Sequence, residues 1–509
     1  MFGPESKLFP KASKLGAGHG NSQFPGQGVG DIPNWRAKYQ YVLNQEIMGT
    51  DNAYYRCTAD HVATDNFGAD FFGGLWELMA SPLAATSVGY SNVLWVDGTL
   101  GNNGTALAGR FDKPYSTLSQ ALTIAASMSP TSTSRVLIHV RRGSYSGTHQ
   151  LRNFVDVYCE AGVVFTSSAS FSDTTAGPVT ANVFGYAKFI TSSGTGPCLR
   201  FERASTINFE FDSMSVAGSL VNVIPNSGSS NITINCNSME SLTTVGSGLG
   251  MTIRAGANLT LNVRNFIKCP HDIFDLRASF SGKFIVTCPK IILTSSNLFG
   301  GNFKSVVKIT GAMVSGSRVE INGNLYNEAP TYLGGTSSMI HFGSSGTCEV
   351  FMNGDIYAGT TIGVWGNTSA TSNLIMNGSI YSQIQAITAT SAGRYLFKNG
   401  SYVLYSTLAV LFPTMRIANT CSVYVLNGVF YNQNTDGNII ELTNDTAFLN
   451  LNHVIADSEG AAGEFVTTAL AQAQRFNNVR SRKAVNVLIT DALVPSGLII
   501  DANLLIPKF

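Results

Sequence analysis

The sequence predicts an all-β fold in which the chain winds into a solenoid, a single-stranded parallel β-helix. Three observations lead to this fold class: the length of the chain, a repeat whose period suits one coil, and a regular alternation of apolar and polar residues within the repeats. At 509 residues the chain is too long for one ordinary compact core, whereas a solenoid lengthens by repetition.

Related segments recur at intervals close to 25 residues. The segments INFEFDSM, ITINCNSM and LTLNVRNF place Asp212, Asn237 and Arg264 at equivalent positions. Further along, an Asn-Gly pair between two apolar runs recurs five times, with spacings of 31, 24, 22 and 28 residues, at Asn322, Asn353, Asn377, Asn399 and Asn427. Periods of this size are typical of solenoids. One coil buries too few side chains to offset its ordering entropy, so the coils must stack.

The alternation within a coil separates its inner and outer faces. Ile207, Phe209 and Phe211 are expected to point inward, with Glu210 and Asp212 outward.

The Asn-Gly pairs have two interpretations. One copy alone would indicate a type I′ hairpin turn. Recurrence at a coil-length period favours a corner between two faces, where Gly and Asn accept a left-handed backbone and successive Asn side chains bond to one another as a ladder.

Residues 1–33 are rich in Gly, Pro and polar residues and are expected to form an extended arm, ordered only by docking. Residues 34–90 follow as a small β module. Its segments YYRCTADHVAT and GLWEL resemble the small β module of bacteriophage tail and fibre proteins, which implies that the arm docks on a virus particle. Trp35 and Trp76 either stack on sugars or form the core of the module.

Residues 91–134 contain a strand, a loop rich in Gly and Asn, and a helix with Leu118, Ala121, Leu122 and Ala125 on one face. The order VDG, KPYSTLSQAL and RVLIHVRRGSY resembles the start of a right-handed parallel β-helix of the pectate-lyase-like class. In that class a helix plugs the N-terminal end, which would otherwise expose an apolar cross-section and unpaired strand edges. The β-helix itself is expected over residues 135–457.

The pattern changes after residue 457. Residues 458–509 offer an amphipathic helix from about 464 to 476 and short apolar strands. We expect this segment to be a C-terminal cap or a trimerisation element.

Composition narrows the range of partners. Charged residues make up 12% of the chain and the formal net charge is +1, which gives no electrostatic reason to expect nucleic acid or an anionic membrane as partner. No run approaches the roughly 20 apolar residues of a membrane span. The cysteines form no CxxC pair and are expected to be free, mostly buried thiols: Cys57, Cys159, Cys198, Cys236, Cys269, Cys288, Cys348 and Cys421. We expect no metal and no cofactor.

Two sets of residues are candidates for a functional site. Glu210 and Asp212 lie two apart on one outward face, about 7 Å, within the roughly 5 to 9.5 Å that separates glycosidase carboxylates. Arg264 lies two coils further on, where it is placed to stabilise charge. The alternative is a solvated strand face without catalysis.

Tyrosines form the second set. Tyr326, Tyr357, Tyr381 and Tyr431 follow the Asn-Gly pairs at one common offset, whereas Tyr402 lies one place earlier. Such a stripe serves either as a surface for stacking sugars or as a structural ladder.

Resemblance to phage tailspikes and tail fibres implies a homotrimer on the virion, made in the host cytoplasm, that contacts a host surface polysaccharide. Three functions stay open at this point. They are a receptor-binding fibre or spike, a depolymerase that hydrolyses or cleaves polysaccharide, and a purely architectural fibre on head or tail.

Overall fold

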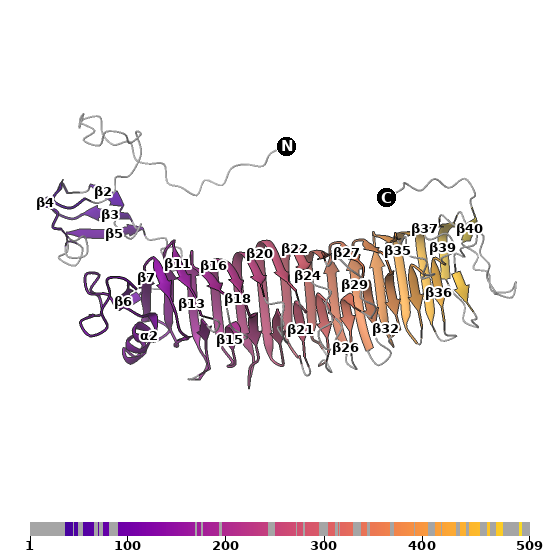
Figure 1. Cartoon of the computed structure of the whole chain (residues 1–509), viewed down its shortest axis with the longest axis horizontal. Coiled ribbons are helices and arrows are strands. Elements are labelled where there is room, and N and C mark those ends of the chain that lie inside the picture. Colours follow the sequence, from indigo (N-terminus) through magenta and orange to yellow (C-terminus); the bar gives the residue numbers. More distant parts are fainter. Residues whose placement is uncertain are drawn as a thin grey trace, which may run out of the picture.

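The computed structural model describes residues between 36 and 500. Undescribed positions within that range are 44, 49–53, 66–69, 71–74, 81–89, 168–169, 175–176, 193–195, 227, 243–249, 271, 278–279, 295–303, 311–313, 315, 329–336, 344–346, 367–370, 391, 406–412, 419, 434–437, 444–446, 459–465, 469–474 and 482–497. The predicted arm lies outside the described residues. The chain forms a small antiparallel β module and a long solenoid (Figure 1).

The small module consists of two short antiparallel sheets. One pairs β1 (Gln40–Tyr41) with β4 (His61–Val62), and the other has the order β2 (Glu46–Met48), β3 (Tyr54–Cys57) and β5 (Trp76–Ala80). Five buried side chains form its core: Tyr41, Ile47, Cys57, Ala63 and Trp76.

The solenoid is a right-handed parallel β-helix, which confirms the predicted fold class. One of its sheets has 13 described strands, one from each coil: β9 (His149–Gln150), β12 (Phe171–Ser172), β15 (Pro197–Phe201), β17 (Ser219–Val223), β19 (Met251–Ile253), β21 (Phe274–Leu276), β23 (Val307–Ile309), β25 (Ser338–Phe342), β28 (Ile362–Gly366), β31 (Gln385–Ala389), β34 (Met415–Ile417), β36 (Ile440–Leu442) and β38 (Val466–Thr468).

The other sheet has 22 described strands and is bent, so that each coil contributes two of its faces. Its strands are β6 (Tyr90–Val96), β7 (Arg135–Val140), β8 (Gly143–Tyr145), β10 (Val155–Cys159), β11 (Val163–Phe165), β13 (Thr180–Gly185), β14 (Lys188–Thr191), β16 (Thr206–Val216), β18 (Ser230–Ser241), β20 (Ala257–Cys269), β22 (Lys283–Leu293), β24 (Arg318–Asn327), β26 (Thr347–Asn353), β27 (Ile356–Gly359), β29 (Thr371–Asn377), β30 (Ile380–Ser382), β32 (Ala392–Lys398), β33 (Ser401–Leu404), β35 (Ser422–Asn432), β37 (Phe448–Ser458), β39 (Arg475–Ser481) and β40 (Leu498–Ile500). The bend is visible in β16, whose first half pairs with β13 and whose second half pairs with β14.

The interior of the solenoid is one continuous apolar core. The predicted alternation is confirmed, because Ile207, Phe209 and Phe211 are buried whereas Glu210 between them is exposed. Described cysteines that are free thiols, all of them buried, are Cys57, Cys159, Cys198, Cys236, Cys269, Cys288 and Cys421.

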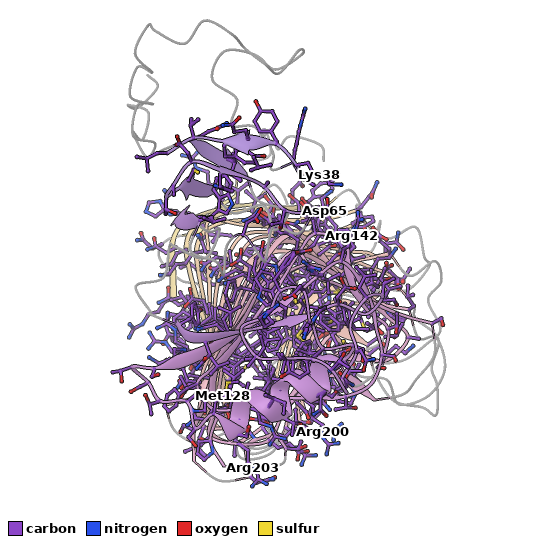
Figure 2. The ribbon with its side chains drawn as sticks, turned by 90° about the vertical axis from the view of Figure 1, so that its left-hand side faces the viewer. Lys38, Asp65, Met128, Arg142, Arg200 and Arg203 are labelled. Carbon is purple, nitrogen blue, oxygen red and sulfur yellow. The ribbon has the colours of Figure 1, made fainter. Side chains whose placement is uncertain are left out.

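Helix α2 (Leu118–Ser127) packs against the first coils. The four side chains predicted to share its apolar face are all buried, and the helix contacts β6, β7, β9 and β10. Thr117 caps its N-terminus by accepting a hydrogen bond from the backbone N–H of Gln120. Figure 2 looks along the shaft from the N-terminal end and shows this helix, which Met128 follows, lying across the near end.

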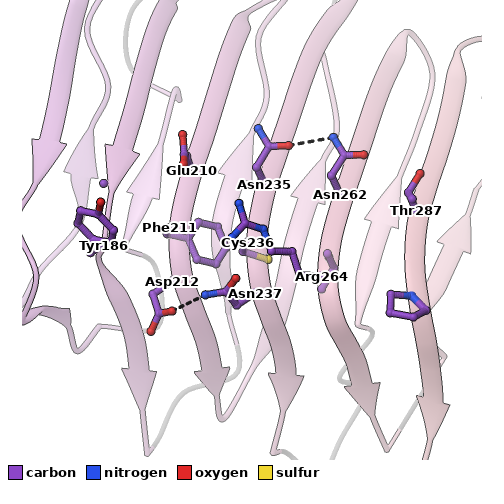
Figure 3. A pocket seen from close by; sticks show the side chains of 13 residues that line it. Tyr186, Glu210, Phe211, Asp212, Asn235, Cys236, Asn237, Asn262, Arg264 and Thr287 are labelled. Atoms are coloured by element: carbon purple, nitrogen blue, oxygen red, sulfur yellow. Dashed lines mark hydrogen bonds between the residues drawn. The ribbon is translucent and has the colours of Figure 1, made fainter. Parts of the chain in front are cut away.

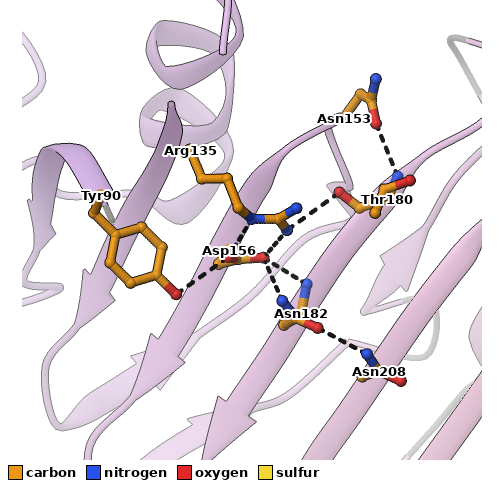
Figure 4. A network of polar contacts seen from close by, with 7 residues as sticks. All are labelled: Tyr90, Arg135, Asn153, Asp156, Thr180, Asn182 and Asn208. Atoms are coloured by element: carbon orange, nitrogen blue, oxygen red, sulfur yellow. Dashed lines mark hydrogen bonds and ion pairs between the residues drawn. The ribbon is translucent and has the colours of Figure 1, made fainter. Parts of the chain in front are cut away.

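A buried ion pair links the first coils of the solenoid to one another (Figure 4). The guanidinium of Arg135 donates two hydrogen bonds to the carboxylate of Asp156, which is fully buried. Tyr90 Oη donates to Asp156 Oδ2 at 3.1 Å, and the side chain of Asn182 donates to Oδ1 at 3.0 Å. Removing either charge would leave the other buried and unpaired, so this network fixes how β6, β7, β10 and β13 sit on one another.

The C-terminal part corrects one prediction. The helix predicted from about 464 to 476 is wrong where the chain is described, because Val466–Thr468 forms β38 and β39 begins at Arg475. β38 pairs with β36 and β39 pairs with β37, both in parallel. The run Val466, Thr467, Thr468 is β-branched, which favours a strand beside an open sheet edge. Coils therefore continue beyond residue 457, and a capping or trimerising role for the remainder stays a prediction.

The Asn-Gly pairs lie at the bend between the two halves of the bent sheet, as the corner interpretation predicts. Gly323, Gly354 and Gly378 have φ between +144° and +148°, and further on it is Asn399 and Asn427 that take a left-handed backbone. Their pairing with neighbouring coils is parallel, so they are not hairpin turns.

Amide bonds of the predicted ladder are present at three of the four steps between these corners, with none between the described side chains of Asn353 and Asn377. The side chain of Asn353 donates to Asn322 Oδ1 at 2.8 Å, Asn399 donates to Asn377 at 3.2 Å, and Asn427 donates to Asn399 at 3.1 Å. Each bond links one coil to the next.

Gly354→Ala is expected to destabilise the shaft. A Cβ at this position would lie 2.3 Å from the carbonyl oxygen of Gly323, and φ is +144°. The strain should cost about 1 to 3 kcal/mol of stability and lower the midpoint of thermal unfolding. Gly177→Ala is the matched control, because nothing lies within 4 Å of its added Cβ. Equal unfolding midpoints for the two variants would contradict this account of the corner.

Acid is expected to destabilise the fold through buried histidines. His149 packs between Phe165 and Phe171, and its Nδ1 lies 3.1 Å from Ser119 Oγ in α2. Burial lowers the pKa of His149 to about 4, so the unfolded chain binds a proton more readily than the folded one. The stability present above pH 6.5 is therefore lost progressively as the pH falls from 6.5 to 4.

The measurement is thermal unfolding at several pH values between 7 and 4, for the wild type and for His149→Gln. Glutamine does not titrate, so the variant should lose less stability over this interval. Identical pH dependence in the two proteins would show that His149 is not responsible.

Candidate functional site

A hollow of about 640 Å³ opens on the bend of the 22-stranded sheet (Figure 3). Successive coils line it, from the turn between β13 and β14 through β16, β18 and β20 to β22. Glu210, Asp212 and Arg264, which the sequence analysis selected as candidates, all line this hollow. The structure thus brings the candidate carboxylates and the arginine together.

The width of the corner explains why the hollow lies here. One row of paired residues flanks the bend on one side and a second row flanks it on the other: Glu210, Asn235, Asn262 and Thr287 in the first, Ser213, Ser238, Phe266 and Lys290 in the second. Two residues separate the rows in β16, β18 and β22, and three separate them in β20.

The Asn-Gly corners are narrower. Gly323 alone separates Asn322 from Asn324, which pair with Thr287 and Lys290 of the preceding coil. The next corner likewise has a single glycine between Asn353 and Asp355. A corner of one glycine presents no side chain, so the hollow ends where the Asn-Gly series begins.

Asp212 is held in place by two neighbouring coils. Asn237 Nδ2 donates to its Oδ1 at 2.7 Å, and Lys188 Nζ lies 3.5 Å from its Oδ2. Its side chain is 31% exposed, so one edge of a fixed carboxylate faces the hollow. Such a group suits positioning of a ligand that carries hydroxyl donors.

Glu210 and the amides beyond it form a polar row along the shaft. Glu210 is exposed, and no described residue donates a hydrogen bond to its carboxylate. It pairs in register with Asn235, whose side-chain oxygen accepts a bond of 2.9 Å from Asn262. The row presents carboxylate and amide groups at the coil spacing of about 4.8 Å.

Tyr186 is a residue of the hollow that the sequence analysis missed. The residue is 57% exposed and lies at the N-terminal end of the hollow. Gly185 precedes it with φ of +117°, and a Cβ there would lie 2.1 Å from the carbonyl oxygen of Cys159. The signal in the sequence was an aromatic directly after a glycine, one coil before INFEFDSM.

Arg264 sits on a β-bulge. Val263 pairs with Cys236 and Phe266 with Ser238, so Arg264 and Asn265 together oppose one residue of β18. A bulge redirects side chains, and Figure 3 shows Arg264 directed into the hollow. No described carboxylate lies within ion-pair distance of its guanidinium, which is exposed.

The tyrosine stripe is a stack. The rings of Tyr326 and Tyr357 lie 4.8 Å apart and those of Tyr357 and Tyr381 lie 5.2 Å apart, all nearly parallel. Both faces of Tyr357 are therefore covered by tyrosines and are closed to a sugar. This geometry favours the structural ladder over a glycan surface.

Tyr431 does not extend this stack. It belongs to the same row, but Val403 lies between it and Tyr381, and its side chain is buried. Tyr402, one place earlier, points into the core.

The tryptophans of the small module carry no exposed site in the described residues. Trp76 is 3% exposed and its ring lies 4.8 Å from that of Tyr41, which favours the core of the module over a sugar platform. Trp35 lies outside the described residues.

No group of three or more His, Cys, Asp and Glu side chains in the part of the chain that the structure describes is placed to hold a metal ion. No described helix has the length and apolar character needed to cross a membrane.

The carboxylates, amides, arginine and exposed tyrosine of the hollow are chemically suited to a polar ligand with many hydroxyl groups. Comparison of the chain with protein-family models, with curated proteins and with solved structures finds no match in any of the three.

Proposed function

We propose that the chain is a fibre or spike of a bacteriophage particle, anchored by its N-terminal arm, whose shaft binds a glycan of the host surface. The observation that carries the proposal is the hollow on the bend of the shaft. It combines an exposed aromatic ring, a fixed carboxylate and a row of amides on a rigid scaffold.

Each part of the hollow has a role in this proposal. The ring of Tyr186 stacks on the apolar face of a sugar. The carboxylates of Glu210 and Asp212 accept hydrogen bonds from hydroxyl groups, and Asn262 supplies an amide. Parallel pairing of successive coils holds these groups in place, which limits the entropy lost on binding.

The particle, the homotrimer and the attachment through residues 1–33 belong to the same proposal. They are supported by the resemblance of YYRCTADHVAT and GLWEL to phage tail modules and by the elongated shaft (Figure 1). A long solenoid suits a fibre because its length separates the two ends.

A depolymerase is the second candidate, because Glu210 and Asp212 line the same hollow. Hydrolysis requires one carboxyl as acid and the other as base or nucleophile. Asp212 is engaged by Asn237 and Lys188, whereas Glu210 faces water. Binding therefore has the stronger support of the two.

Tyr186→Ala is expected to weaken glycan binding roughly tenfold, the effect of losing about 1.4 kcal/mol of stacking. The measurement is binding of the purified full-length chain to an array of bacterial capsular polysaccharides and lipopolysaccharide O-chains. Tyr357→Ala serves as the control, because it opens the tyrosine stack and should lower stability without changing binding. The proposal is wrong if the wild type binds no glycan, which is the result expected of an architectural fibre.

Glu210→Gln separates binding from hydrolysis. If the chain only binds, the wild type releases no reducing ends from a bound polysaccharide. If it is a depolymerase, the wild type releases them and Glu210→Gln stops the release while binding persists.

A further inference from the structure

We infer that the glycan bound in the hollow is acidic, with a carboxylate group that pairs with Arg264. This inference rests on the proposed function and adds the chemical class of the ligand and its direction along the shaft. It starts from the charges of the hollow that have no partner among the described residues.

Charged side chains of both signs line the hollow. Glu210 and Asp212 lie at the end nearer the N-terminus of the shaft, and Asp212 is already paired with Lys188. The backbone of Arg264 lies two coils further along the shaft, and Figure 3 shows its side chain reaching back beside Cys236 in the middle of the hollow. Lys290 follows directly after Pro289, which lines the far end of the hollow. Both cations are exposed, and neither lies within ion-pair distance of a described carboxylate.

Several other cations of the shaft are paired with carboxylates. Arg135 is paired with Asp156, Arg141 with Asp97 at 3.2 Å, and Lys308 with Asp272. Other exposed cations of the shaft, such as Arg254 and Lys283, also lack an ion pair among the described residues, and what sets Arg264 apart is that a bulge turns it into the hollow. A planar guanidinium recognises a carboxylate through two parallel hydrogen bonds, and a neutral sugar cannot supply that partner.

The spacing sets the size of the ligand. Three coil steps separate Tyr186 from the backbone of Arg264, about 14 Å at the usual strand spacing, and the side chain of Arg264 reaches back toward Tyr186 over part of this distance (Figure 3). A segment of about two or three sugar units fits between Tyr186 and the guanidinium of Arg264. One sugar stacks on Tyr186, hydroxyl groups donate to Glu210 and Asp212, and the acidic sugar lies at Arg264.

Arg264→Gln is the test, because it removes the charge from an exposed side chain and leaves the core untouched. The probes are uronate-containing capsular polysaccharides, each used in its native form and in a form whose carboxyl groups have been reduced to alcohols. The wild type is expected to bind the native form about tenfold more tightly than the reduced form, with the difference shrinking as salt is added. Arg264→Gln should abolish the difference.

Two further variants keep the result interpretable. Arg254→Gln is the matched control, since Arg254 is an exposed arginine of the same coil outside the hollow, and it should retain the preference for the native form. Arg264→Lys keeps the charge but not the bidentate geometry and should retain part of the preference.

The outcomes separate this inference from the proposed function. Equal binding of native and reduced polysaccharide, or a preference that survives in Arg264→Gln, overturns the acidic ligand and leaves glycan binding intact. Failure of the wild type to bind either form of any polysaccharide overturns both.

Discussion

Parallel hydrogen bonding of each coil to the coils before and after it is the constraint on which the structure depends. No coil is stable alone, so every coil must keep the register of its neighbours. Register fixes which residues follow one another along the shaft, both inside and outside. The inner rows become a continuous core, and the outer rows become ladders such as Asn322 with Asn353 and stacks such as Tyr326 with Tyr357. The pairing register of the backbone therefore determines which side chains are neighbours on this surface.

Within that constraint the corner is the part of a coil that is free to vary. At Gly354 the backbone of one coil comes so close to the carbonyl of the previous coil that a Cβ does not fit, and the corner presents no side chain. In β16, β18, β20 and β22 the corner holds two or three residues, and Asp212 and Arg264 extend outward from it. The number of residues at the bend thus decides whether a corner presents no side chain or contributes side chains to the hollow.

Features of the fold that follow from a repeating sequence pattern could be predicted from the sequence. The alternation around Phe209, the buried face of the helix at Leu118 and the role of the Asn-Gly pairs could all be predicted, because each follows from a period. Tyr186 and the width of the corners could not, because counting the residues at a bend requires knowing which residues pair across coils. The helix near Val466 was predicted wrongly because a short apolar run fits both periods, and pairing with the preceding coil decides between them.

Stability requires charged groups to be paired, whereas binding of a ligand requires some of them to be unpaired. In the shaft the two kinds of charged group lie in different places. Where Asp156 is buried it is fully bonded, because an unpaired charge in that place would cost several kcal/mol. At the widened corners the cost is small, since water reaches the side chains, and Glu210 and Arg264 stand there without partners among the described residues. Neither contributes much to holding the coils together. Their exposure in one hollow is what the proposed acidic glycan requires, because the fold itself gains little from either charge.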